Sequence, residues 1–436
     1  MIDWRVALIT LVIVFLFYFV VLYRKPDVNW GTSSQAMNLQ DALNSIQELF
    51  HIEEHILALT GPPRSRPALV DFAICKKNSM LVCQNLLQDK LSTKNRADIL
   101  QKSYKHLRTN DIKGFCSLIG NVDLPSGTSA MLEVVGVGKI KPNILLIGFK
   151  NDWRVCDQHS QASISPQYSH AGFSLHVGVA ILRVSGGLDY SAVLGDSDQP
   201  FQGGEDGRPP SIILETPPGT PDAERRNTIS DSPFVSKEKS LTRNSFTELI
   251  HSDRDADGNE LPRYICNNIT RFQKKQPEGS IDVRWLYDDG GLTLLLPYII
   301  STRSHWSACQ LRVFCTANAQ EKVEKEREGM AALLNKLRIN YADLVVITDL
   351  NKPPSPPRPE NERINLQAKT DRHCRLRELV VDHSSDSNLV VMTLPMPRKE
   401  AVSAPMYMAW LETLTANMPP FLLVRGNQTS VLTFYA

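Results

Sequence analysis

The sequence predicts an α/β protein with one N-terminal transmembrane helix, followed by two α/β subdomains with mainly parallel sheets that are separated by a disordered loop. Three observations predict this arrangement. Residues 6–23 form an uncharged apolar run. Two later regions alternate short, continuous apolar runs with longer helical stretches, a pattern typical of strands buried on both faces of a parallel sheet. Between these regions lies a long segment rich in Pro and Ser and poor in apolar residues.

The apolar run reads VALITLVIVFLFYFVVLY and contains no charge, Gly or Pro. A helix of about 20 residues crosses the ~30 Å hydrocarbon core of a bilayer, so we assign residues 1–26 to a transmembrane helix. Arg24 and Lys25 follow the run directly, and the positive-inside rule places the C-terminal side in the cytosol. Three interpretations are open at this point: a cleaved signal peptide, the signal anchor of a single-pass protein, and the last span of a larger membrane protein.

Residues 27–56 predict a linker that enters a helix. Ser33 and Ser34 are candidate N-cap residues, because they precede apolar residues with helical spacing at positions 36, 39, 42, 43 and 46. A helix in this position couples the membrane segment to the region that follows it.

The first α/β subdomain is predicted at residues 57–195. Its strand candidates are four short apolar runs, at Ile56–Leu59, Met80–Cys83, Asn143–Phe149 and Leu175–Val184. The first run ends at the strong turn sequence Thr60-Gly61-Pro62-Pro63.

Residues 196–277 predict a disordered acidic loop rich in Pro and Ser. Within 196–262, Leu, Ile, Val and Phe make up 12 of 67 residues, and 14 acidic residues face 7 basic ones. Such a segment buries too little apolar surface to offset the entropy of ordering it. Thr228, Ser230 and Ser232 lie in the stretch RRNTISDSP, where the preceding arginines and the Ser-Pro pair are typical of kinase targets. We therefore predict these three residues as candidate phosphorylation sites.

The second α/β subdomain is predicted at residues 278–436. An amphipathic helix is expected at 323–337, and a Pro-rich break at 351–361 excludes both helix and central strand. Two α/β units in series suggest a pseudo-repeat, although the two regions show no convincing similarity in sequence. The strand candidates are Ile281–Leu286, Leu311–Cys315, Leu344–Ile347, Leu389–Leu394 and Phe421–Val424.

Composition and motifs argue against several classes of function. The net charge is +1 and no basic stripe is present, which argues against a nucleic-acid-binding protein. No P-loop, GxSxG or HExxH motif occurs. The eight cysteines form no CxxC motif, so free thiols in a reducing compartment are expected rather than a metal site or a disulfide framework. We therefore predict no catalytic residue, no cofactor and no metal ligand, and hence a protein that is not an enzyme.

Two patterns have a chemical and a structural interpretation. Asp288 and Asp289, followed by two glycines, could hold a metal ion, or could cap a helix beginning near Leu292; we favour the cap. His383 to Asp386 contains the residue types of a nucleophilic site, but adjacent residues do not place a base against a hydroxyl group. We expect a loop before the strand at Leu389.

Five stretches along the chain resemble cation-chloride cotransporters, in the order in which that family has them. They are YRKPDVNWG at 23–31, GPPRSRPAL at 61–69, IDVRWLYDDGGLTLL at 281–295, AVSAPMYMAW at 401–410, and the ending LVRGNQ with VLTFY at 423–435. The ending and the 401–410 stretch are similar to the sodium-dependent branch, the Na-K-Cl and Na-Cl cotransporters. The resemblance covers the last transmembrane span and the cytosolic domain of that family.

The resemblance implies a cytosolic regulatory and dimerisation region of an electroneutral, sodium-gradient-driven chloride importer of the plasma membrane. Phosphorylation and the chloride and volume state of the cell are its expected inputs, with regulatory kinases and phosphatases as partners. The transported Na, K and Cl ions bind among other spans of the family, so no ion-binding residue carries over to this chain. Two alternatives stay open: a single-pass scaffold that recruits kinases, and a nucleotide-sensing α/β domain.

Overall fold

The computed structural model describes residues 4–23, 37, 41, 55–74, 80–136, 141–154, 176–194, 261–317, 323–348, 364–396 and 402–427. The chain divides into two compact units, residues 1–52 and 53–436, which are described separately. Thr228, Ser230 and Ser232, the Pro-rich break at 351–361 and nearly all of the predicted linker at 27–56 lie outside the described residues.

The first unit contains helix α1 (Trp4–Tyr23), which matches the position of the predicted span. Its described side chains are exposed, and the rings of Phe15, Tyr18 and Phe19 contact one another. Across the described parts of the chain, no helix satisfies both the length and the apolar character needed to cross a membrane. The transmembrane helix therefore stays a prediction.

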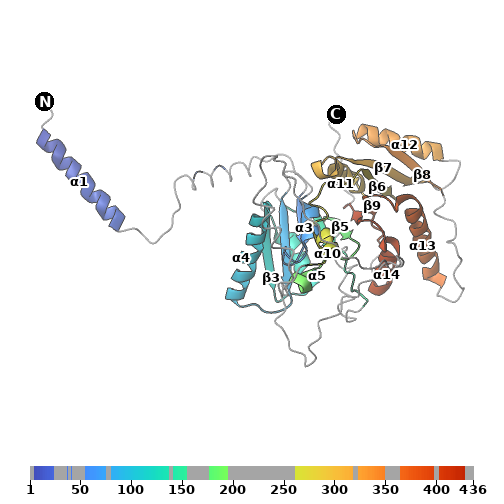
Figure 1. The fold of residues 1–436 in the computed structure, drawn as a ribbon, viewed down its shortest axis with the longest axis horizontal. Coiled ribbons are helices and arrows are strands. Elements are labelled where there is room, and N and C mark those ends of the chain that lie inside the picture. Colours follow the sequence, from blue (N-terminus) through green and yellow to red (C-terminus); the bar gives the residue numbers. More distant parts are fainter. Residues whose placement is uncertain are drawn as a thin grey trace, which may run out of the picture. The chain divides into compact units, whose positions relative to one another are not determined.

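The second unit is built on one ten-stranded sheet with the order β3-β2-β1-β4-β5-β10-β9-β6-β7-β8 (Figure 1). The strands of its first half are β1 (Ile56–Leu59), β2 (Leu81–Leu87), β3 (Gly114–Gly120), β4 (Ile144–Gly148) and β5 (Gly178–Arg183). Those of its second half are β6 (Gly279–Trp285), β7 (Cys309–Thr316), β8 (Asp343–Ile347), β9 (Leu389–Thr393) and β10 (Phe421–Arg425). We call these two sets the first and the second half-sheet.

The two half-sheets share one topology. Within each, the strands are parallel and follow the order third, second, first, fourth, fifth. Their fifth strands, β5 and β10, pair antiparallel, with Phe421 opposite Arg183 and Arg425 opposite Val179. This antiparallel pair, which we call the seam, relates the halves as an approximate two-fold repeat. The repeat in topology accords with the predicted pseudo-repeat, and the sequence pattern did not predict that both halves share one sheet.

Helices cover both faces of the sheet, because parallel strands need crossover connections. Residues of α3, α4, α11 and α12 join the hydrophobic cluster on one face, and residues of α13 and α14 join that on the other face of the second half-sheet. The described helices of this unit are α3 (Pro67–Ala73), α4 (Thr93–Thr109), α5 (Leu124–Val134), α8 (Ser191–Leu194), α10 (Arg263–Ile269), α11 (Leu292–Ser301), α12 (Val323–Lys336), α13 (Ile364–Ser384), α14 (Ala404–Thr415) and the 3-10 helix η1 (Ser304–Trp306).

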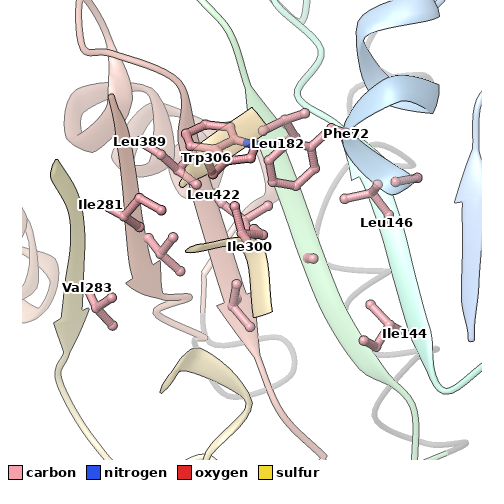
Figure 2. Packing of buried hydrophobic residues seen from close by; sticks show 14 of the residues in the cluster. Phe72, Ile144, Leu146, Leu182, Ile281, Val283, Ile300, Trp306, Leu389 and Leu422 are labelled. Carbon is pink, nitrogen blue, oxygen red and sulfur yellow. The ribbon is translucent and has the colours of Figure 1, made fainter. Parts of the chain in front are cut away.

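The hydrophobic core crosses the seam without interruption. Figure 2 shows Phe72 of α3 and Leu182 of β5 from the first half packed in the same cluster as Leu422, Ile300 and Trp306 from the second. On the opposite face, Val179 and Ile181 join Phe421 and Leu423 in a second cluster. Burial of apolar surface contributes about 25 cal/mol per Å². The shared clusters therefore bind the two half-sheets into one body.

The predicted disordered loop at 196–277 is wrong for its last part. Residues 261–277 are described, and they include helix α10 and the buried side chain of Phe272. The Phe272 ring lies 5.1 Å from the ring of Phe72 and 6.2 Å from that of Trp306. The polar composition of the preceding residues hid this stretch, whose residues Leu261, Ile265, Ile269 and Phe272 are spread over twelve positions.

A small buried cluster joins the two described segments that flank residues 195–260. Leu194, at the end of α8, and Leu261, directly before α10, pack together with Tyr190. The described chain therefore ends and resumes at one place on the surface of the sheet.

Candidate functional site at the seam and the strand ends

Ligand sites in parallel α/β sheets lie beyond the carboxyl ends of the strands, where the strand order reverses. In the first half-sheet this point lies between β1 and β4. The chain's own groups bind each other there: Arg66 Nη1 donates to the Thr60 carbonyl at 2.6 Å, and Arg66 forms an ion pair with Asp189. Burial raises the pKa of Asp189, but the charge of Arg66 and the bonds from Ser191 outweigh it and hold the pKa below its usual value.

The equivalent point of the second half-sheet lies between β6 and β9, and Asp289 occupies it. The Asp289 carboxylate is fully buried and accepts hydrogen bonds from Gly291 N (3.2 Å), Thr293 N (3.3 Å) and Thr293 Oγ1 (2.7 Å). It also accepts from Gly426 N at 3.0 Å, directly after β10. The predicted capping role is confirmed for Asp289, which accepts from Thr293 N in the first turn of α11, although the N-cap position itself is the left-handed Gly291.

Both half-sheets thus share one hydrogen-bonded connection. The loop after the first strand bonds to the segment after the fifth strand, through Ser65 O and Tyr190 N (2.8 Å) in the first half and through Asp289 and Gly426 N in the second. These contacts fill both reversal points with structural hydrogen bonds. The arrangement positions the fifth strands, which form the seam.

A polar cluster ties the halves together on the face covered by α14. Glu412 of α14 accepts from Trp153 Nε1 at 2.9 Å and from Arg154 Nε at 3.0 Å, both of which come from the first half. Arg183 of β5 lies 3.9 Å from Glu412 Oε1 and donates to Thr415 Oγ1 at 2.8 Å. Glu412 is only 19% exposed and Trp153 is buried, so loss of the carboxylate would leave the indole N–H without its acceptor away from water.

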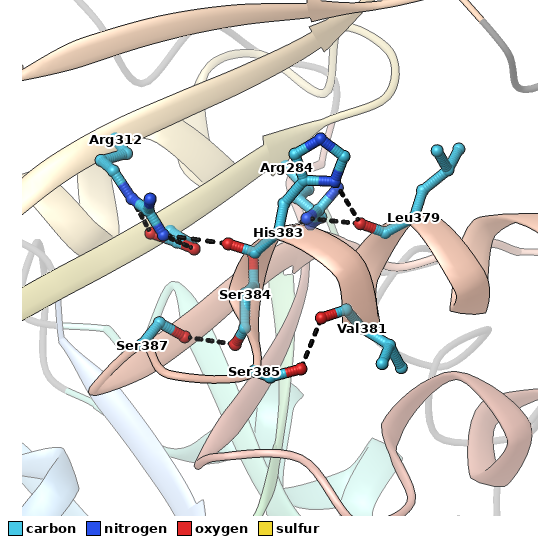
Figure 3. A network of polar contacts seen from close by, with 9 residues as sticks. Arg284, Arg312, Leu379, Val381, His383, Ser384, Ser385 and Ser387 are labelled. Carbon is cyan, nitrogen blue, oxygen red and sulfur yellow. Dashed lines mark hydrogen bonds and ion pairs between the residues drawn. The ribbon is translucent and has the colours of Figure 1, made fainter.

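A second network of charges lies under α13 (Figure 3). Asp282 of β6 is fully buried, and Arg312, directly opposite on β7, binds it through two nitrogens at 2.8 and 2.6 Å. Arg284 is also buried; it lies over the Phe314 ring at 4.5 Å and donates to Ser384 Oγ at 2.9 Å. Burial lowers the pKa of Arg284 to about 10, against the opposing effect of Asp282.

The stretch from His383 to Asp386 belongs to the same network. The structure extends α13 to Ser384, so the predicted loop is wrong for its first two residues. His383 Nδ1 contacts the Leu379 carbonyl at 2.9 Å, and Ser384 accepts from Arg284, so neither residue acts on the other. The last turn of the helix is fixed by buried partners that a local pattern does not show.

A cavity of about 440 Å³ lies at the carboxyl ends of β6 and β7, against α12. Its described lining includes Trp285, Cys315, Glu326 and Arg372. Burial, together with the nearby Glu326, raises the pKa of Cys315 to about 11. The segments 318–322 and 349–363, which continue from β7 and β8, lie outside the described residues.

One predicted site has a structural role in this fold, and one polar cluster was not predicted. Asp288 and Asp289 lie in the loop before α11 and accept hydrogen bonds from its backbone N–H groups and those of the helix start. The cluster of Glu412, Trp153 and Arg183 was not predicted from the sequence. No local signal marks that cluster, because Glu412 lies more than 200 positions from Trp153 and Arg183. The three candidate phosphorylation sites remain predictions.

Comparison with known proteins identifies the family. The model of solute carrier family 12 matches residues 66–361 and 358–436. A bumetanide-sensitive sodium-(potassium)-chloride cotransporter from Manduca sexta is 37% identical over the whole chain, which covers 46% of that protein. Solute carrier family 12 member 2 from Danio rerio and member 1 from Oryctolagus cuniculus are each 35% identical, with 42% and 43% of their lengths covered.

The chain spans less than half the length of these relatives. Among solved structures, the cytoplasmic domain of a prokaryotic cation chloride cotransporter overlaps with 86% of this chain and 96% of its own, at 9% identity and a TM-score of 0.42. The two family matches meet at residues 358–361, inside the Pro-rich break. The family predicted from the sequence is confirmed: the chain belongs to solute carrier family 12.

Proposed function

We propose that this chain is the cytosolic regulatory and dimerisation region, with the last membrane span attached, of an electroneutral sodium-(potassium)-chloride symporter of the plasma membrane. The observation that carries the proposal is the 37% identity over the whole chain to a protein named as a sodium-(potassium)-chloride cotransporter. The chain covers 46% of that relative, so the ion pathway of the complete transporter lies in the other part.

The described fold suits a regulatory role. Both reversal points of the sheet are filled by the chain's own hydrogen bonds, at Thr60 and Asp289. The shared core and the Glu412 cluster make residues 53–436 one compact unit. A unit of this kind suits the transmission of a signal between a modified segment and a membrane domain, because packed cores shift between discrete arrangements.

Helix α1 is the proposed last span, with the following residues in the cytosol. The uncharged apolar run at residues 6–23 supports this proposal, because a helix of about 20 residues spans the ~30 Å hydrocarbon core of a bilayer. Protease protection of a C-terminal tag in intact cells tests the orientation. A tag that proteases reach from outside the cell would contradict it.

Phosphorylation of Thr228, Ser230 and Ser232 is the proposed input, and a homodimer is the proposed assembly. A phosphate adds a charge of about −1.5 to −2 at pH 7 and creates a site for arginine partners. Mass spectrometry of the chain from cells in low-chloride medium tests the modification, and sedimentation of the purified chain tests the dimer.

The deciding experiment measures the size of the native protein with an antibody raised against residues 281–436. The 48.9 kDa of this chain corresponds to 46% of the Manduca sexta relative, so a complete cotransporter gives a band above about 100 kDa. Depletion of that protein should then reduce chloride-dependent, bumetanide-sensitive rubidium uptake. A single band near 48.9 kDa with unchanged uptake would replace the proposal with the single-pass scaffold.

A further inference from the structure

Two cysteines lie opposite each other on neighbouring strands near the edge of the first half-sheet. In the parallel pair β2–β3, Cys83 is in register with Cys116. Neighbouring strands lie about 4.8 Å apart, within the 4.4–6.8 Å that separates the Cα atoms of disulfide-bonded cysteines. In-register side chains also point to the same face of the sheet, so the backbone brings the two sulfur atoms side by side.

The surroundings of the two thiols differ. Cys83 is 1% exposed and packs in the main hydrophobic cluster, whereas Cys116 is only partly buried, on the edge strand β3. The Cys83 thiol donates a hydrogen bond to the Cys116 sulfur, which lowers the pKa of Cys116 despite partial burial. The same bond, with burial, raises the pKa of Cys83. Cys116 is therefore the thiol that ionises first and the one that solvent reaches.

The edge strand holds this geometry in place. Tyr104 Oη donates to the Cys116 carbonyl at 3.2 Å, and Arg96 Nη2 donates to the Leu118 carbonyl at 2.8 Å. Both donors come from α4, which covers this face, so the helix binds the outer edge of β3 and fixes it against β2. The pair thus has an accessible attacking sulfur, a buried resolving sulfur and a fixed backbone between them.

We infer that Cys83 and Cys116 form a redox-active dithiol that hydroperoxides oxidise to a disulfide linking β2 to β3. The Cys116 thiolate attacks the peroxide, taking one oxygen and releasing the remainder as hydroxide, so that a sulfenic acid forms. The Cys83 sulfur then attacks the Cys116 sulfur and water leaves. In sum, two thiols and one hydrogen peroxide give one disulfide and two waters, and two electrons pass from the sulfur pair to the peroxide. An external thiol reverses the step by exchange.

The inference concerns this chain alone and does not depend on transport. Six of the eight cysteines are described, and all six are free thiols. Among these, Cys83 and Cys116 are the pair that a strand register places face to face. Cys266 of α10 is partly buried like Cys116 and its thiol donates to the Leu261 carbonyl, which makes it a matched control.

The test is peptide mapping of the purified full chain. Trypsin cleavage after Lys and Arg gives the peptides 78–90 and 114–139, each with one cysteine. After treatment with a few equivalents of hydrogen peroxide and blocking with N-ethylmaleimide, we expect these peptides to appear linked, two hydrogens lighter than their sum. Dithiothreitol should restore both. Recovery of the two peptides separately alkylated, or of Cys116 as a sulfinic acid beside an alkylated Cys83, would overturn the inference.

A dithiol reagent gives an independent readout. Phenylarsine oxide condenses with two neighbouring thiols and releases one water, so one equivalent should protect both peptides from N-ethylmaleimide in the unmodified chain. Cys83→Ser should remove the protection of Cys116 and slow its reaction with peroxide several-fold. Cys266→Ser should leave protection and linkage unchanged. Equal protection of Cys116 in the presence and absence of Cys83 would contradict the pairing.

Discussion

Glu412 accepts a 2.9 Å hydrogen bond from the indole of Trp153, a residue that precedes it by 259 positions. One residue belongs to α14 of the second half, and the other follows β4 of the first half. With Arg154 and Arg183, this contact makes the Glu412 carboxylate a polar link between the two halves on that face, beside the bond from Arg183 to Thr415.

Replacing Glu412 by Ala should destabilise the chain by about 2–3 kcal/mol, because the buried Trp153 indole N–H loses its acceptor and Arg183 loses the nearby carboxylate. Urea denaturation followed by tryptophan fluorescence measures the change. Glu133→Ala, at an exposed position of α5, is the control and should stay within about 0.5 kcal/mol of the unmodified chain. Equal effects of both variants would show that the link contributes nothing.

Alanine substitutions of the neighbouring residues Asp288 and Asp289 should differ sharply in their effect on stability. Asp289→Ala leaves three backbone N–H groups without their acceptor, among them those of Thr293 and Gly426, and should cost about 3 kcal/mol. Asp288 is exposed and accepts only from Gly290 N, so Asp288→Ala should cost less than about 1 kcal/mol. Thermal unfolding of the two variants makes the comparison, and a larger loss for Asp288→Ala would contradict the structural assignment.

Asp71 should make the stability depend on pH. Burial raises the pKa of Asp71 from 3.8 to about 7, although the hydrogen bond from Gln273 lowers it. Because the folded pKa is the higher one, the stabilisation is complete below about pH 3.8 and is lost as the pH rises through 7. The free energy of unfolding of Asp71→Asn, relative to that of the unmodified chain, should therefore rise by about 1–2 kcal/mol from pH 5 to pH 8. This figure is reduced because Asp71 is partly exposed. Urea unfolding at the two pH values tests it, and a constant difference would be the contrary result.

Two glycines should respond to alanine in opposite ways. A Cβ atom at Gly426 would lie 1.9 Å from the Asp289 carbonyl oxygen, so Gly426→Ala should displace the end of β10 and cost more than about 2 kcal/mol. A Cβ atom at Gly329 of α12 meets nothing within 4 Å, so Gly329→Ala should stabilise by about 0.5–1 kcal/mol. Melting temperatures that fall for both variants would be inconsistent with this picture of α12.

The strands that were predicted from the sequence are those marked by a short apolar run within the strand itself. Ile56–Leu59 and Leu389–Thr393 are short apolar runs between turn residues, and such runs mark strands buried on both faces. Strand β3 was missed, because it begins and ends with glycine and exposes Phe115 at the edge of the sheet. An apolar run also carries no information about its neighbour, so nothing in β5 or β10 predicts their antiparallel pairing.

Polar contacts between residues close in the sequence were likewise predictable, and those between distant residues were not. The cap at Asp289 was predictable, because the acid, the two glycines and the helix start lie within a few positions. The partners of Asp282 and of Glu412 were not predictable, since Arg312 and Trp153 reach them only after the sheet has formed. A buried carboxylate and its distant cation carry no shared sequence signal.

The meeting of Leu194 and Leu261 in one buried cluster has a consequence for the chain between them. Because Leu194 and Leu261 lie in one cluster, the folded unit holds the two ends of that stretch together, and closing a longer loop between fixed ends costs only about 0.6 kcal/mol per doubling of its length. A protease cut between 195 and 260 should accordingly leave two pieces that stay associated through the seam, and the two halves expressed as separate chains should reassemble by fragment complementation.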